Sequence, residues 1–310
     1  MKRETIIEEK SLYRDSFRID AFSFGEGNKD VCVLGSLRGN EYQQLYTASL
    51  LVSKLLELEN KGKLIKGHKI TVIPCANPSS MNIHKRFWPI DNTDINRMFP
   101  GYNKGETTQR VAATLFEHLT GYKYGIQFAS FYLPGKFVPH VRMMKTGYEN
   151  VLMAKQFGMP YVVLHTPRPF DTGTLNYNWQ IWETNAFSIY TTSTDTIDPN
   201  SAKEAVDAIL IFLAKEGIIS YRGLEGYISR VVESKDFVNI RAERAGFFLP
   251  LAEAGEHVEE GELIATIKDC YTQEILQNVV SPSDATIAFI SNEAIIYQNS
   301  SLFKLIKDQE

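Results

Sequence analysis

Strand-like and helix-like runs of apolar residues alternate along the first two thirds of the chain. Residues 30–35 (DVCVLG) form a short apolar run that ends in glycine, as a buried strand does. Residues 41–61 follow, with apolar positions at helical spacing and charges between them. Further strands are predicted at 17–24, 69–75, 124–131, 161–165 and 186–192, and further helices at 107–119, 147–157 and 201–216. This alternation is typical of a layered α/β fold.

The sequence changes in character after residue 219. The remaining segments are short and β-rich, and glycines interrupt them. A chain of 310 residues also exceeds the usual size of one compact domain. We therefore expect an α/β domain at 1–219 and a small all-β domain at 220–310. The run GFFLPLAEAGEHVEEGELIATIKD, followed by VVSPSDATIAFI, resembles the barrel-sandwich module of biotinyl and lipoyl carriers.

The overall charge excludes several classes of partner. The net charge is −4, and no block of lysine and arginine stands out, so we expect no binding to nucleic acid. The first residues are charged, and no segment approaches the length needed to cross a bilayer, so we expect no membrane association. Three widely separated cysteines fit reduced thiols better than disulfides. These features predict a cytoplasmic protein.

A dense group of polar residues lies between residues 77 and 101, where we expect neither a helix nor a strand. The group consists of Arg86, Asp91, Asp94, Asn96 and Arg97, among aromatic residues and prolines. Ligands of α/β proteins collect where strands end, and guanidinium groups suit carboxylates because they donate paired hydrogen bonds. The group therefore predicts a site for a small carboxylate-bearing molecule. Surface ion pairs that fasten a long loop are the alternative, and they explain any one of these residues equally well.

Three motifs in this order carry a resemblance to a known family. They are GxxRGNE at 35–41, NP at 77–78 and RFxPIDxxDINRxFPG at 86–101. Together they resemble the aspartoacylase and succinylglutamate desuccinylase branch of the zinc carboxypeptidase-like hydrolases. The resemblance implies a mixed central sheet flanked by helices and an amide-hydrolysing activity on small N-acyl amino acids. It also implies that Arg86, Asn96 and Arg97 grip the substrate carboxylate or acyl carbonyl, and that Arg86 helps to polarise the scissile bond.

The chain departs from the family pattern where zinc is expected. Relatives read GxHGxE at the first motif, and this chain has Arg38 at the histidine position, while Glu41 is retained. Relatives read DLH at the end of a later strand, and the matching residues here are 127–129 (QFA). The catalytic glutamate of the family has no counterpart within 188–194. Zinc, implied by the resemblance, is thus expected to be absent or to be bound by a different ligand set, with Glu41 the only family ligand that remains.

Arg38 allows two interpretations. A permanent cation at this position replaces the charge of the metal, pairs with Glu41 and helps to hold an anionic ligand. Alternatively, Arg38 and Glu41 form a simple structural ion pair at the start of a helix. His140, which lies shortly beyond the missing third ligand, is a further candidate to line the pocket.

Two functions therefore compete. The first is a hydrolase of amide or ester bonds, in which Glu41 is a ligand or the base and the metal needs a set such as Glu41, His140 and Asp94. The second is a non-catalytic descendant that binds or senses a carboxylate, with Arg38 in place of the metal. The aromatic segment 175–183 covers the pocket or seals a contact in a homo-oligomer, although we expect at least one of its tryptophans to lie in the core.

Overall fold

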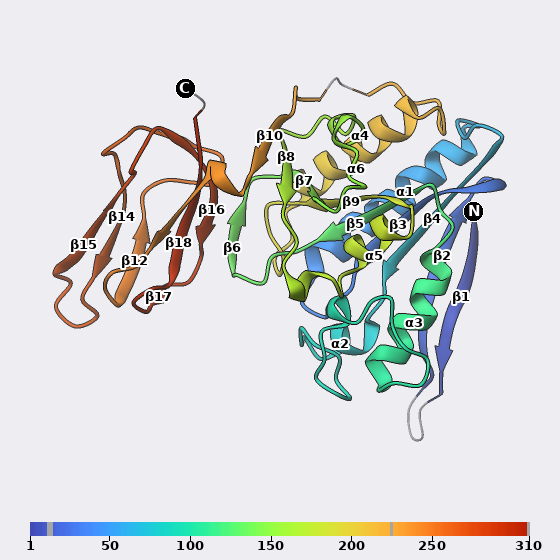
Figure 1. The fold of residues 1–310 in the computed structure, drawn as a ribbon, viewed down its shortest axis with the longest axis horizontal. Coiled ribbons are helices and arrows are strands. Elements are labelled where there is room, and N and C mark those ends of the chain that lie inside the picture. Colours follow the sequence, from blue (N-terminus) through green and yellow to red (C-terminus); the bar gives the residue numbers. More distant parts are fainter. Residues whose placement is uncertain (11–14, 224–225, 309–310) are drawn as a thin grey trace. The chain divides into compact units, whose positions relative to one another are not determined.

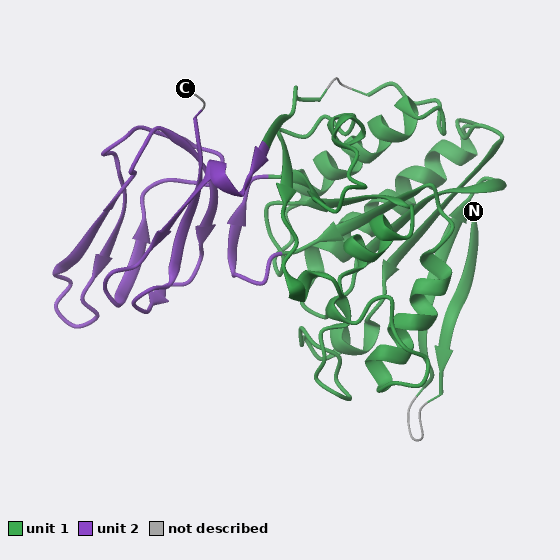
Figure 2. Ribbon diagram, viewed as in Figure 1, with its two compact units in different colours: residues 1–130, 139–231 green, residues 131–138, 232–310 purple. Residues whose placement is uncertain are grey.

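The computed structural model describes residues 1–10, 15–223 and 226–308. The chain forms two compact units, drawn in different colours in Figure 2. Unit 1 contains residues 1–130 and 139–231, and unit 2 contains residues 131–138 and 232–310.

Unit 1 is built on a mixed sheet that, in the described residues, has nine strands in the order β1-β2-β4-β3-β5-β9-β7-β8-β10 (Figure 1). Strands β3, β4, β5 and β9 run parallel to one another, whereas β7 is antiparallel to β9. The strands are β1 (Lys2–Glu9), β2 (Phe17–Phe24), β3 (Gly27–Ser36), β4 (Gly67–Cys75), β5 (Tyr124–Ala129), β7 (His140–Met144), β8 (Tyr161–His165), β9 (Asn185–Tyr190) and β10 (Arg230–Glu233).

Helices cover both faces of this sheet. They are α1 (Tyr42–Asn60), α2 (Pro78–Asn82), α3 (Thr107–Leu119), α4 (Val151–Lys155), α5 (Leu175–Ile181) and α6 (Pro199–Lys215), with short 3₁₀ turns at Ile95–Arg97 and Pro169–Asp171. Alternate residues of β3 enter two separate cores: Val31 and Val33 pack with α1 and α6, and Cys32 and Leu34 pack with α3 and α5. A strand that is buried on both faces reads as a continuous apolar run, which is why β3 is visible in the sequence.

Unit 2 consists of two small sheets around a core of its own. One sheet has the order β11-β18-β16-β13, with β6 added to β16, and the other has the order β15-β14-β12-β17. Its strands are β6 (Gly135–Phe137), β11 (Phe237–Arg241), β12 (Gly246–Pro250), β13 (His257–Val258), β14 (Leu263–Lys268), β15 (Ile275–Val280), β16 (Ala285–Ser291), β17 (Ile295–Ile296) and β18 (Ser301–Lys307). The core includes Phe248, Ile267, Ile287, Phe303 and Leu305.

The predicted fold class is confirmed: a mixed α/β sheet flanked by helices is followed by a small all-β unit. The observed division differs from the expected boundary after residue 219 in two respects. Residues up to 231 stay with unit 1, since β10 adds to the edge of the large sheet. Residues 131–138 join unit 2, since β6 pairs with β16.

Some local predictions were wrong. The segment expected to lack regular structure contains α2 and a 3₁₀ turn at Ile95–Arg97, each begun by a capping side chain, Asn77 and Asp94. The helix predicted at 147–157 is only Val151–Lys155, since the Asn150 side chain caps it late. In the described part of the chain, no helix is long and apolar enough to cross a membrane.

Candidate functional site

The turn after β3 and the segment after β4 meet through their main chains. Gly39 lies in the turn, and its N–H donates a hydrogen bond to the carbonyl of Arg86 at 3.4 Å. A Cβ atom on Gly39 would lie 2.2 Å from the carbonyl carbon of Ser80 and 2.3 Å from the carbonyl oxygen of Lys85. Only glycine permits so close an approach. This contact brings the two predicted polar segments together.

Arg38 lies between two carboxylates in the interior of unit 1. Its Nη1 donates to Glu41 Oε1 at 3.0 Å, and its Nε and Nη2 donate to the two oxygens of Asp94, each at 2.9 Å. The Arg38 residue is 5% exposed and Glu41 is fully buried. A two-pronged pairing of this kind fixes the plane of the guanidinium group. Arg38 therefore links the start of α1 to the segment after β4.

Glu41 has its hydrogen-bonding capacity largely filled by protein donors. Oε2 accepts from the backbone N–H groups of Leu37 and Arg38 at 2.8 and 3.1 Å, and Oε1 accepts from Arg38 Nη1 at 3.0 Å and from Ser130 Oγ at 2.5 Å. Glu41 also precedes α1, where the helix dipole favours a negative charge. These contacts hold the carboxylate in one orientation.

The charges of this cluster are strongly coupled. Burial alone would lower the pKa of Arg38, but the neighbouring charges of Asp94 and Glu41 outweigh it and raise the pKa above its ordinary value. Burial opposes ionisation of Asp94, yet the Arg38 charge and hydrogen bonds keep the pKa of Asp94 below its usual range. Arg38 and Asp94 are therefore both charged near neutral pH.

Arg86 is the unpaired cation beside this cluster. Its side chain has no hydrogen bond or ion pair to any residue within 1–10, 15–223 or 226–308. Burial, and next the charge of Arg38, lower the pKa of Arg86 to about 10. A partly buried guanidinium without a carboxylate partner is costly, and an anion placed beside it would relieve that cost.

The residues expected to grip a ligand next to Arg86 have internal partners. Asn96 Oδ1 accepts from the backbone N–H of Leu175 at 3.0 Å. Arg97 Nη1 donates to Asp171 Oδ1 at 3.1 Å and to the Phe170 carbonyl at 2.8 Å. Asn96 and Arg97 therefore fasten the segment before α5 to the segment after β4, and their ligand roles stay predictions.

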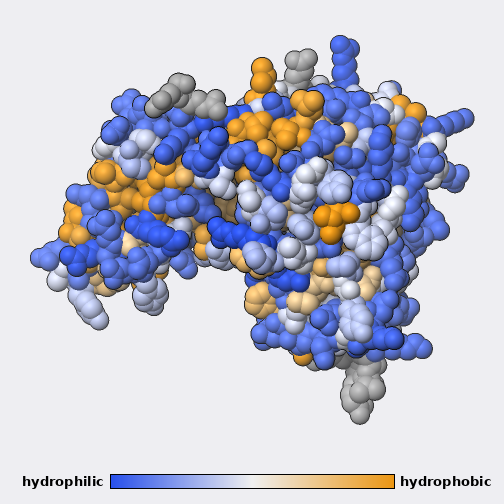
Figure 3. Space-filling view, in the orientation of Figure 1, coloured by the Kyte–Doolittle hydropathy of each residue, from blue (hydrophilic) through white to orange (hydrophobic). Residues whose placement is uncertain are grey.

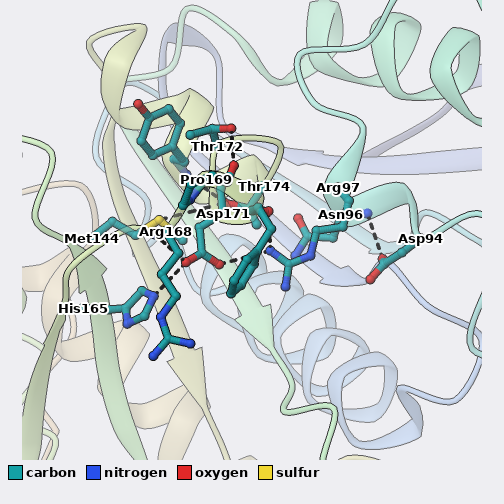
Figure 4. Close-up of polar contacts among 12 residues, drawn as sticks. Asp94, Asn96, Arg97, Met144, His165, Arg168, Pro169, Asp171, Thr172 and Thr174 are labelled. Carbon is teal, nitrogen blue, oxygen red and sulfur yellow. Dashed lines mark hydrogen bonds and ion pairs between the residues drawn. The ribbon is translucent and has the colours of Figure 1, made fainter. Parts of the chain in front are cut away.

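Asp171 joins this arrangement to β8. Figure 4 shows its carboxylate between Arg97 and His165, and His165 Nε2 lies 2.9 Å from Asp171 Oδ2. Burial, followed by the charge of Arg142, lowers the pKa of His165, whereas the Asp171 hydrogen bond and charge raise it. The net shift is downward. His165 is consequently neutral at pH 7.

His165 and Asp171 yield a first prediction. Replacing Asp171 by Asn removes the two influences that raise the pKa of His165, so this pKa should fall further in Asp171→Asn. An NMR titration of the histidine ring protons measures the shift, and exposed His257 serves as the internal control. In the native protein the lowered pKa means that the contribution of His165 to stability is present above about pH 6.5 and is lost as the pH falls through the folded-state pKa. A rise of the His165 pKa in the variant would contradict the assigned network.

Sequence reasoning missed Arg142, which lies on the same side of β7 as the candidate His140. Residues two apart on a strand share a face, and the register places Arg142 opposite Ser188 and His140 opposite Tyr190 on β9. Arg142 Nη1 donates to the Tyr190 hydroxyl at 3.2 Å, and the His140 ring stacks on the Tyr190 ring at 4.6 Å. The alternation of polar and apolar residues at 140–144 (HVRMM) was the sequence signal that could have identified this strand and Arg142. The strand itself went unrecognised.

The arrangement of these residues does not form a zinc site. In the described part of the chain, no group of three or more histidine, cysteine, aspartate or glutamate side chains is placed to hold a metal ion. The set Glu41, His140 and Asp94, suggested from the sequence, is thus not assembled, because Asp94 and Glu41 are both bound to Arg38. Zinc needs about three protein ligands with free lone pairs. The position expected to supply another ligand is Ala129, which has only a methyl group.

Two surface cavities lie away from the candidate residues. One cavity of about 640 Å³ is lined by residues at the amino ends of β3, β5 and β9, among them Lys29, Tyr122 and Trp182. Another of about 400 Å³ is lined by residues of α1 and of 220–222. The candidate site is therefore described by its buried charges and not by either of these two cavities.

Comparisons with known proteins agree with this fold. Residues 28–214, more than half of the chain, match the family model described as the succinylglutamate desuccinylase/aspartoacylase catalytic domain. No curated protein sequence matches the chain.

Solved structures share the fold at low sequence identity. A succinylglutamate desuccinylase/aspartoacylase from Rhodobacter sphaeroides is 19% identical, with a TM-score of 0.77 over 96% of this chain and 91% of that one. The ectoine utilization protein EutE (DoeB) from Ruegeria pomeroyi, in a product-bound structure, is 17% identical, with a TM-score of 0.79 over 95% and 90%. A protein described as a succinylglutamate desuccinylase/aspartoacylase, from Shewanella frigidimarina, is 19% identical, with a TM-score of 0.78 over 99% of this chain and 96% of that one. Since the family model covers most of unit 1, including both polar segments, the chain belongs to the succinylglutamate desuccinylase/aspartoacylase family.

Proposed function

We propose that this protein binds a small carboxylate-bearing molecule at Arg86 and does not hydrolyse it by the zinc chemistry expected of its family. Arg38 supplies a fixed positive charge in place of the metal. The observation that supports this proposal is the contrast between the two arginines: Arg38 is paired with two carboxylates, whereas Arg86 has no anionic partner among the described residues.

The unequal pairing of the two arginines explains why a single anionic group suits the site. Arg38 lies between Glu41 and Asp94, so these three groups together carry one negative charge. Arg86 brings the formal charge of the cluster to zero, but among the described residues no carboxylate contacts it directly. A ligand carboxylate that pairs with Arg86 gains two charge-assisted hydrogen bonds and relieves the repulsion between Arg86 and Arg38.

Hydrolysis of an N-acyl amino acid is the second candidate, and family membership favours it. It needs a base that takes a proton from water. Glu41 is the candidate base of the first motif, but its oxygens accept four hydrogen bonds, one of them from a paired arginine. A carboxylate offers about four lone-pair sites, so these contacts leave Glu41 little capacity to accept a hydrogen bond from water. We therefore place binding before hydrolysis.

Binding and turnover of one probe on the same preparation distinguish the two functions. The protein is purified without chelator, its zinc content is measured, and N-succinylglutamate and N-acetylaspartate are titrated by calorimetry. We expect substoichiometric zinc, saturable binding of at least one probe, and no release of free amino acid over hours. Stoichiometric zinc that survives dialysis, together with release of glutamate or aspartate, would reject the proposal. Absence of binding by any N-acyl amino acid or simple dicarboxylate would also reject it.

A further inference from the structure

A row of polar side chains crosses the large sheet of unit 1 on the face that α5 covers. Gln127 on β5 pairs with Ser188 on β9, and Ser188 pairs with Arg142 on β7. Residues directly opposite each other in neighbouring strands share a face of the sheet. Gln127 also pairs with Leu34 of β3, which packs in the core with α3 and α5. The row therefore lies beneath these two helices.

Helix α5 adds Asn176 to this row. Trp179 lies on β5, since a Cβ atom on Gly125 would be 2.7 Å from its Cδ2 atom, and Gln180 Nε2 donates to the Met144 carbonyl of β7 at 3.0 Å. Asn176 precedes these two helix residues by three and four positions, so it shares their face of the helix. It therefore faces β9, which lies between β5 and β7. The end of α5 leads into the amino end of β9, so Asn176 lies further towards the carboxyl end of that strand.

These side chains have unused hydrogen-bonding capacity. Asn176 is 3% exposed, and neither its Nδ2 nor its Oδ1 has a partner in the described part of the chain. Within the same residues, the side chains of Gln127 and Ser188 make no hydrogen bond. Figure 3 shows hydrophilic residues over most of the visible face of unit 1, where water satisfies them. A buried amide without a partner is destabilising, which indicates that a bound group completes this row.

Arg142 gives the row a positive charge beside the candidate site. Its side chain is partly exposed, and among the described residues it donates one hydrogen bond, to the Tyr190 hydroxyl, and forms no ion pair. Tyr190 pairs with Ala129 at the end of β5, and the next residue, Ser130, donates to Glu41. The row thus begins next to the residues that surround Glu41. Water alone would satisfy an amide here, but it would leave the charge of Arg142 without an anion.

We propose that Arg142 binds a second carboxylate of the ligand, with Ser188 and Asn176 as further donors, so that the molecule held at Arg86 carries two acidic groups. This inference rests on the proposed function, in which Arg86 binds the first carboxylate. A guanidinium group, a hydroxyl and a primary amide all donate hydrogen bonds, and a carboxylate accepts about four of them. Arg142 is accordingly a residue that determines which carboxylates bind.

Calorimetric titration of the full chain with dicarboxylates and their monoamides tests this inference. The probes are N-acetylaspartate, N-acetylasparagine, which lacks the side-chain carboxylate, and N-acetylisoasparagine, which lacks the α-carboxylate. The corresponding N-acetylglutamate series is one methylene longer and covers a wider spacing between the two arginines. We expect one dicarboxylate to bind about tenfold or more tightly than both of its monoamides, because each amide loses a hydrogen bond between charged groups.

Substitutions assign each carboxylate to its arginine. Arg142→Gln should abolish the preference over one monoamide, and Arg86→Gln should abolish the preference over the other. Arg168→Gln makes the same change in net charge at an exposed residue whose charge also reaches His165, and it should keep both preferences. Asn176→Leu should weaken binding of the dicarboxylate without lowering the midpoint of urea unfolding, since the amide that it removes has no partner among the described residues.

The outcomes separate this inference from the proposed function. Monoamides that bind as tightly as the dicarboxylates would overturn the second carboxylate and leave the Arg86 site in place. An Arg142→Gln variant that keeps both preferences would do the same, as would an Asn176→Leu variant that is less stable but binds with native affinity. If neither series binds, this inference fails, and the proposed function fails with it only when N-succinylglutamate and simple dicarboxylates do not bind either.

Discussion

Replacing Arg38 by leucine should destabilise the protein by about 3–5 kcal/mol, the usual cost of removing one partner from a buried ion pair. The loss arises because Glu41, which is fully buried, and Asp94 would lose the cation that lies between them. Urea denaturation followed by circular dichroism measures the change. The same substitution at Arg3, whose pair with Asp20 is mostly exposed, should cost only about 0–1 kcal/mol and serves as the matched control.

The pH dependence of the Arg38→Leu variant gives an independent check. In the native protein the pKa of Asp94 is depressed, so its contribution to stability is present above about pH 4 and is lost as the pH falls through the folded-state pKa. Without Arg38, the charge and the hydrogen bonds that oppose the effect of burial are lost, so the pKa of Asp94 should rise. The difference in stability between native and variant should then shrink as the pH is lowered. A difference that is small at pH 7, or that grows in acid, would show that Arg38 does not compensate these carboxylates.

The chain retains the fold and two motifs of its family but differs at the position where the family resemblance implies a metal ligand. The fold, the turn with Glu41 and the segment with Arg86 are retained, whereas the position expected for a metal ligand holds a guanidinium group that has two carboxylates of its own. A fold alone does not determine an activity, because activity depends on particular side chains. Under the proposed function, Arg38 supplies a positive charge but not the open coordination position on which hydrolysis by zinc depends.

The parts of the fold that sequence predicted well are those whose burial pattern is simple. The helix Thr107–Leu119 and the strand Tyr161–His165 were placed with their observed bounds. Strand β1 was missed because five of its eight residues are charged. Helix α5 was missed because it has only seven residues and carries buried Asn176, Asn178 and Gln180 beside Trp179. Trp179 itself is fully buried, which confirms the expectation that one tryptophan of this segment lies in the core.

Sequence predicted the part of the candidate site that depends on local spacing. The Arg38–Glu41 pair involves residues three apart at a predicted helix start, so local spacing was sufficient. The pairing of Arg38 with Asp94 spans 56 residues, and that of Arg97 with Asp171 spans 74. Nothing in the local pattern says which carboxylate an arginine will find at that separation. The sequence therefore predicted Arg38, Glu41, Asp94 and Arg97 as site residues, but not Asp171, and it could not predict that Arg86 would have no anionic partner among the described residues.

The second prediction with a large expected effect concerns the replacement of Arg86, which has no anionic partner among the described residues. Arg86→Gln should weaken binding of a carboxylate ligand by about 1.5–3 kcal/mol, or roughly 10- to 150-fold, because a charged hydrogen-bonding partner is lost. Its effect on the stability of the free protein should have the opposite sign or be close to zero, since the variant removes a partly buried cation that has no partner among the described residues. Calorimetric titration and urea denaturation of the same preparation measure both quantities.

The opposite directions of these two effects distinguish a binding residue from a structural one. A structural arginine loses stability when it is replaced, as Arg38 should, whereas a ligand-binding arginine held without a partner loses affinity and leaves the fold intact. Arg244→Gln, on the exposed surface of unit 2, makes the same change in net charge and should alter neither quantity. If Arg86→Gln destabilised the protein as Arg38→Leu does, or if it bound the ligand with native affinity, the carboxylate site would have to be placed elsewhere. A weaker complex on an equally stable or more stable protein is the result that a preformed anion site at Arg86 requires.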